Sequence, residues 1–75
     1  MGNTEKKLTE AMEALNEGNY QNSFDIFKPL AEDGDPKAQF YLGFLYRIGQ
    51  AVKQDCQQAY HWYLLSAKQI GRAHV

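Results

Sequence analysis

Residues 35–49 of this chain of 75 residues read DPKAQFYLGFLYRIG. Asp35 can accept hydrogen bonds from the free N–H groups of a first helical turn, and Pro36 suits the first helical position. Gly49 takes, without steric cost, the left-handed conformation that ends many helices. The stretch therefore predicts a helix over residues 36–48. This helix is apolar on nearly all sides, so we expect other helices to enclose it or its surface to be adhesive.

Two residues inside predicted helices are unusual for their positions. Gly43 costs about 1 kcal/mol relative to alanine in a helix interior, which indicates a place where another helix passes closely. Pro29 removes a backbone donor and crowds the carbonyl of Asp25. We therefore expect a close helix crossing at position 43 and a kink or an irregular turn at position 29.

Three further helices are predicted around the central one. Apolar residues recur in them at spacings of three and four, and strand signals are absent. Glycine and capping residues mark their ends. The predicted helices cover residues 4–17, 20–33 and 56 to about 69. The chain is therefore predicted to be all-α.

The chain also matches itself weakly, which indicates a repeat. A shift of 31 positions relates the first predicted helix to the third, and a shift of 36 positions relates the second to the fourth. With the second shift, Phe24 falls on Tyr60, Phe27 on Tyr63 and Ala31 on Ala67. Two helix pairs of one kind are therefore predicted.

The second pair carries a set of small and aromatic residues at characteristic spacings. The set consists of Ala38, Gln39, Leu42, Gly43, Tyr46, Gly49, Val52, Asp55, Ala59, Trp62, Tyr63 and Ala67. With it, residues 18–75 resemble the Sel1-like repeats, relatives of the tetratricopeptide repeats. Residues 29–35 are similar to the segment that precedes such a repeat in bacterial members. The resemblance implies antiparallel helix pairs stacked as a short right-handed α-solenoid.

The resemblance also divides the chain. We expect one helical-repeat domain over residues 1–75, in which 1–34 form a tetratricopeptide-like pair and 35–70 a Sel1-like repeat. Residues 71–75 are a tail or the start of a further repeat. Ala51 stands where the family usually has a second loop glycine, so we expect a different backbone path there. Ser66 stands where alanine is usual, which is a mild departure.

The charge of the chain argues against two classes of partner. The formal net charge is −1, which does not favour nucleic acid or an anionic membrane. Residues 1–35 carry eight acids and three lysines, a net of −5, whereas residues 36–75 carry five basic residues and one acid, a net of +4. The basic residues are spread rather than clustered, and no run approaches the ~18 apolar residues of a membrane span. We therefore expect neither partner.

Residues suited to catalysis or metal binding are sparse. Cys56 is the only cysteine, which excludes an internal disulfide and a thiolate-rich zinc site. Cys56 and His61 would point about 140° apart on a helix, so they cannot form a nucleophile–base pair. His61 and His74 lack a third ligand at a suitable spacing. We expect no enzymatic activity, no cofactor and no metal.

The lone cysteine fits a reducing compartment, and the residues after Met1 lack the apolar core of a signal peptide. We therefore expect a cytoplasmic protein. An exported parent protein stays open as the alternative.

The resemblance implies a non-catalytic scaffold that binds a protein or peptide. The first helix of each stacked pair lines the concave surface, so part of the helix over 36–48 should face a groove. By the helical wheel and the variable positions of the repeat, the partner-binding residues are Tyr41, Phe44, Arg47 and Ile48. An aromatic–arginine cluster suits a binding hot spot. The alternative is that Phe44 and Ile48 simply pack on the first helix.

A second surface suggests a different function. The last predicted helix is too apolar for a solvated cap, and solenoids normally end in polar capping helices. The residues concerned are Tyr60, Leu64 and Leu65. The alternative function is therefore a self-associating module completed by its own copy, packed either head to tail or around a two-fold axis.

Overall fold

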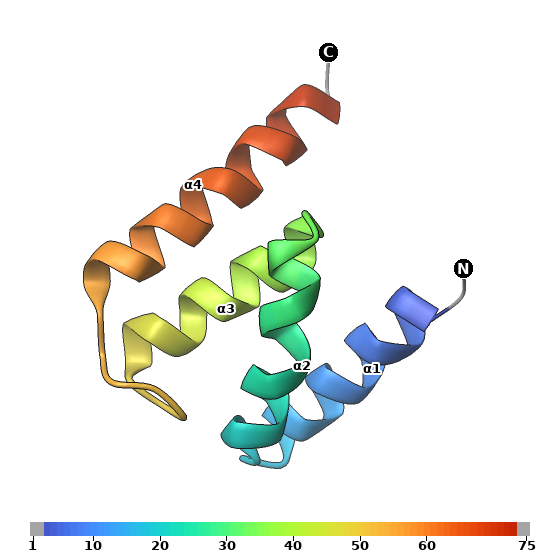
Figure 1. Ribbon diagram of the computed structural model, residues 1–75, viewed down its shortest axis with the longest axis vertical. Coiled ribbons are helices and arrows are strands. Elements are labelled where there is room, and N and C mark those ends of the chain that lie inside the picture. The colour runs from blue at the N-terminus through green and yellow to red at the C-terminus, as the bar shows by residue number, and fades with distance from the viewer. Residues whose placement is uncertain (1–2, 74–75) are drawn as a thin grey trace.

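A computed structural model describes the backbone of residues 3–73 and the side chains of residues 4–69. All regular structure in this part of the chain is helical, which confirms the all-α prediction. The helices are α1 (Asn3–Asn16), α2 (Tyr20–Glu32), α3 (Pro36–Ile48) and α4 (Cys56–Ala73) (Figure 1).

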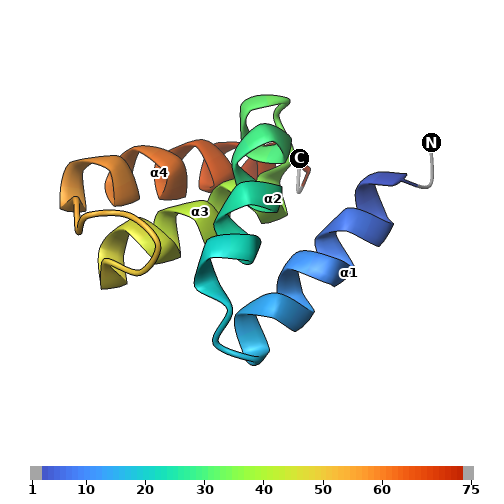
Figure 2. The same ribbon diagram turned by 60° about the horizontal axis from the view of Figure 1, so that its bottom comes forward.

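The helices stack in the order of the chain. α1 packs on α2, α2 on α3 and α3 on α4. Figure 1 shows α4 running back alongside α3, and Figures 1 and 2 together place α1 and α4 at opposite edges of the stack. The arrangement is that of two consecutive helix pairs. The right-handed sense of a longer solenoid stays a prediction.

The predicted bounds of α3 are confirmed at both ends because both ends have a strong local signal. The Ala38 N–H donates to Asp35 Oδ1 at 2.9 Å, with Pro36 in the first turn. At the other end Gly49 has a φ of +71°, and its N–H donates to the carbonyl of Leu45. The helix can therefore neither begin earlier nor run on without losing a cap.

The C-terminal end of α4 lies further along the chain than predicted. α4 continues through Gly71 to Ala73, so the backbone of residues 71–73 extends this helix beyond the predicted end near residue 69. The role of residues 71–75 as a tail or as the start of a further repeat stays a prediction. Residues 74–75 lie outside the described residues. Glycine inside a helix costs only about 1 kcal/mol, which the rest of a long helix can offset.

A kink or an irregular turn is predicted at Pro29; the structure excludes the irregular turn, and the kink stays a prediction. α2 continues past Pro29 to Glu32, and the Asp33 N–H donates to the Pro29 carbonyl at 3.0 Å. Pro29 has no N–H to donate to the carbonyl four residues earlier in the helix. Because Pro29 is exposed on α2, this carbonyl lies on the solvent side of the helix. The proline is therefore accommodated in the last turns of a continuous helix.

The loop between α3 and α4 corrects a second expectation. Ala51 has a φ of +70°, which is the left-handed conformation that a glycine would take there. The backbone path is therefore the one that suits glycine, and alanine adopts it at a cost. After the loop, the N–H groups of Gln57 and Gln58 donate to Asp55 Oδ1, which begins α4.

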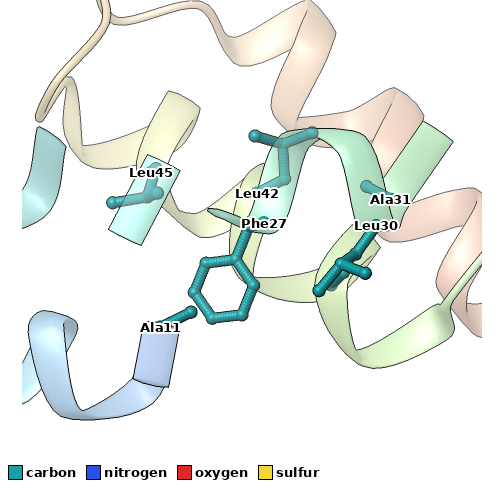
Figure 3. Close-up of a cluster of buried hydrophobic side chains, with 7 residues drawn as sticks. Ala11, Phe27, Leu30, Ala31, Leu42 and Leu45 are labelled. Atoms are coloured by element: carbon teal, nitrogen blue, oxygen red, sulfur yellow. The ribbon is translucent and has the colours of Figure 1, made fainter. Parts of the chain in front are cut away.

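The core lies where α2 meets α1 and α3. Phe27, Leu42 and Leu45 are fully buried, and Phe27 of α2 lies between Ala11 of α1 and Leu42 of α3 (Figure 3). Leu30 and Ala31 extend this cluster along α2. The ring of Phe27 therefore contacts both helix pairs within one hydrophobic core.

The crossing of α3 and α4 is close. A Cβ at Gly43 would lie 3.0 Å from the Ala59 carbonyl oxygen and 3.1 Å from the Tyr63 ring, which confirms the predicted close crossing. Ser66 Oγ donates to the Pro36 carbonyl at 2.8 Å. Ser66 therefore has a structural role that the usual alanine could not fill.

A buried glutamine links three helices. Gln39 Nε2 donates to the Ala31 carbonyl at 3.1 Å, and Gln39 Oε1 accepts from Gln69 Nε2 at 2.8 Å. Gln39 is 4% exposed, so both bonds form where competing water is scarce. The end of α2, the start of α3 and the second half of α4 are thereby held in register.

Candidate functional site

A groove of about 490 Å³ lies between the first helices of the two pairs, α1 and α3. Its apolar part comes from Leu8 and Met12 of α1 and from Tyr41 of α3. These three side chains are half-buried and rest against the hydrophobic core. The remaining lining residues are exposed and polar: Glu5, Thr9, Glu13, Asn16 and Lys37.

Tyr41 is the most firmly held residue of the groove. Its ring stacks on Phe27, with centroids 5.3 Å apart and planes 18° apart. Phe40 packs edge-on against it at 5.2 Å. Because Phe27 is fully buried, Tyr41 has little rotational freedom, and a partner would bind it at a low cost in entropy.

The other three predicted partner-binding residues do not line this groove. Phe44 and Ile48 are half-buried and Arg47 is exposed. Lys37, Tyr41, Phe44 and Ile48 recur at spacings of four, three and four, so they share one face of α3. Phe44 and Ile48 therefore continue the groove-facing side of α3 beyond the groove itself.

Sequence reasoning missed the α1 side of the groove. Leu8 and Met12 belong to the apolar stripe of α1, and such a stripe is expected to face the core. Lys37 follows the helix cap and reads as an ordinary solvated residue. The sequence did contain a signal for this role. Leu8 and Met12 alternate with the polar residues Glu5, Thr9 and Glu13, which places Leu8 and Met12 near the edge of the apolar stripe of α1.

The outer face of α4 exposes large apolar side chains. Tyr60 is 68% exposed and Leu64 is 41% exposed, whereas Leu65 is half-buried. Phe40 of α3, which is 46% exposed, lies beside this face, 5.3 Å from the half-buried ring of Tyr63. The apolar face therefore spans α3 and α4 and includes a residue that the sequence did not single out.

The described part of the chain contains no cluster of three or more His, Cys, Asp or Glu side chains that could hold a metal ion. Cys56 and His61 are both exposed on α4. Between residues 3 and 73, no helix has the length and hydropathy needed to cross a lipid bilayer.

The fold and the groove define a class: an all-helical protein of stacked helix pairs with an open groove between α1 and α3. Residues 36–70, which cover α3 and most of α4, match the family described as the Sel1 repeat. Residues 36–70 therefore form a Sel1-like repeat. Sel1 repeats are in general non-catalytic modules that mediate protein–protein interaction. Searches of the curated proteins and of the solved structures find no match.

Proposed function

We propose that this protein binds a short segment of a partner protein in the groove between α1 and α3. The observation that carries the proposal is the composition of the groove, in which an apolar floor is bordered by charged side chains. Binding hot spots combine a desolvated apolar centre with a polar rim in the same way. The general role of Sel1 repeats in protein–protein interaction agrees with it.

The shape of the floor favours a peptide segment over a compact ligand. Leu8 and Met12 lie one helical turn apart, about 6 Å along α1, so the apolar floor is a strip. Tyr41 lies across the groove from this strip and is the proposed anchor. A longer segment that followed α3 would also reach Phe44 and Ile48, which continue the same face.

The charged residues at the edge of the groove favour a partner of a particular charge. Glu5 and Glu13 border the groove on the α1 side, and Lys37 borders it on the α3 side. Two acids against one lysine favour a segment that carries apolar side chains and a basic residue directed toward α1. The proposed partner is therefore an apolar and basic segment of another protein.

The test begins with a selection of random dodecapeptides on the chain. Thr9 is exposed and lines the groove, so Thr9→Arg places a long side chain in the binding space and replaces a weaker helix former. We expect Thr9→Arg to weaken binding of the selected peptides at least about ten-fold, which corresponds to about 1.4 kcal/mol. Isothermal titration calorimetry measures the dissociation constants.

Gln57→Arg is the matched control because Gln57 is exposed on α4, away from the groove, and the substitution adds the same charge. It should leave peptide affinity within about two-fold of the parent chain. Equal affinities for the parent, Thr9→Arg and Gln57→Arg would show that the peptides bind elsewhere, and the groove proposal would then be wrong.

A further inference from the structure

The outer face of α4 is a second surface that exposes large apolar side chains. The α4 patch consists of Phe40, Tyr60, Tyr63, Leu64 and Ala67. Three of its members are aromatic, and Phe40, Tyr60 and Leu64 are between 41% and 68% exposed. Aromatic side chains are enriched at protein interfaces because each gives a large contact area for little lost entropy.

The internal repeat shows what kind of element covers such a patch. Phe24, Phe27 and Ala31 of α2 occupy the positions that correspond to Tyr60, Tyr63 and Ala67 of α4. In the structure Phe24 packs edge-on against Tyr46 with centroids 6.0 Å apart, and Phe27 stacks on Tyr41. Both partners belong to α3. On α2, therefore, these positions bind the next helix, and the same positions on α4 are suited to receive a helix.

The edge helix α1 is a poor candidate for that helix. Its exposed side chains include Lys6, Glu10 and Glu13, which are charged. Its larger apolar side chains, Leu8 and Met12, pack against the core and line the groove. A head-to-tail stack would place the charged face of α1 on the α4 patch, whose five residues are all uncharged, and would desolvate those charges against apolar side chains.

The α4 patch is instead complementary to itself. Tyr60, Leu64 and Ala67 recur at spacings of four and three, which gives an apolar strip along one side of the helix. Leu64 lies in the middle of this strip. An antiparallel pair of α4 helices centred on Leu64 would place Lys68 opposite Tyr60 of the other copy, so that the ammonium meets an aromatic ring and not a like charge.

We propose that the α4 patch pairs with the same patch of a second copy of this chain, around a two-fold axis near Leu64. The interface is isologous, so each copy contributes the same residues. The patch and the groove use different residues, so pairing leaves the groove open for a partner segment. An experiment that overturns pairing through the α4 patch therefore does not affect the proposal of binding in the groove, and the reverse also holds.

Sedimentation equilibrium of the 75-residue chain over a wide range of concentration tests the association. We expect the mass to rise from the monomer toward the dimer at high micromolar concentration, with little dependence on salt. Tyr60→Ser and Leu64→Ser together should keep the chain monomeric and folded, because both residues lie on the exposed face of α4, outside the buried core. A monomeric parent chain throughout the range would overturn the proposal.

A cysteine placed at the axis tests the geometry. In the variant Cys56→Ser with Leu64→Cys, the two new thiols should face each other, and mild oxidation should give a disulfide-linked dimer within minutes. The control Cys56→Ser with Gln58→Cys carries an exposed thiol about 120° around α4 from Leu64 and should cross-link far more slowly. Association that depends strongly on salt, with no preference for cross-linking at position 64, would contradict the two-fold arrangement.

Discussion

The two helix pairs of this chain follow one plan, but different contacts hold them together. α3 and α4 meet at Gly43 without room for a side chain, and Ser66 and Gln69 of α4 form hydrogen bonds to Pro36 and Gln39 of α3. α1 and α2 meet through apolar side chains around Ala11 and Phe27. Among residues 4–69, no side-chain hydrogen bond joins α1 to α2.

We call α3 and α4 the frame, because the contacts between them fix their relative position more firmly than those between α1 and α2. Close backbone approach and buried hydrogen bonds fix the position of α4 on α3, because small displacements lose several contacts at once. Apolar contacts alone tolerate small shifts of a helix better. The pair that matches the Sel1 repeat is therefore the frame, and we expect α1, one wall of the proposed binding groove, to adjust to a partner more easily than α4 shifts on α3.

The largest effect is expected at the close crossing. Gly43→Leu should lower the free energy of unfolding by about 3 kcal/mol, because the new side chain meets the Ala59 carbonyl and the Tyr63 ring. Gly43→Ala should cost less, since a single methyl group needs only a shift of a few tenths of an ångström from the Ala59 carbonyl and the Tyr63 ring. Urea denaturation followed by circular dichroism measures both. Unchanged or higher stability of Gly43→Leu would show that the frame is not closely packed.

A smaller effect compares the buried serines of the two pairs. Ser66 Oγ has a partner in Pro36, whereas Ser23 Oγ of α2 is buried without a hydrogen-bond partner. Ser66→Ala should therefore cost about 1 kcal/mol, and Ser23→Ala should be neutral or slightly stabilising. Thermal melting of the two variants checks the difference. Equal losses of stability would mean that the hydrogen bond does not distinguish the frame from the first pair.

The smallest effect compares the loops that follow the first helix of each pair. Ala51 has a φ of +70° and Gly18 a φ of +80°, so both backbones are left-handed. Ala51→Gly should raise the free energy of unfolding by about 0.5 kcal/mol, because relief of the strain exceeds the added entropy of the unfolded chain. Gly18→Ala should lower it by a similar amount or more. A destabilised Ala51→Gly variant would contradict the account of this loop.

The fold was predictable where two local signals agreed. Asp35 and Gly49 fixed the ends of α3 because each has one conformation that satisfies the free backbone groups. The helices continue through Pro29 and Gly71 for a common reason: each residue is tolerated in a helix when the surrounding turns are stable. Local propensity therefore located strong boundaries, but it overestimated the power of single residues to break a helix.

Only the α3 side of the groove could be predicted from the sequence. Tyr41 follows from the expectation that the first helix of a pair faces the concave surface. Leu8 and Met12 face both the core and the groove, and which part of each is exposed depends on the angle between α1 and α3. That angle is set by packing across α2, chiefly by Phe27, and no pattern within α1 encodes it.

The central claim is that partner segments bind between α1 and α3, and the most direct test is an NMR titration of the labelled chain with a selected peptide. We predict that the largest shifts of backbone amide signals fall on residues 5–16, Lys37 and Tyr41, and that the amides of residues 56–69 change little. Shifts confined to α4 and to Phe40 would contradict the claim, because the peptide would then occupy the α4 patch instead of the groove.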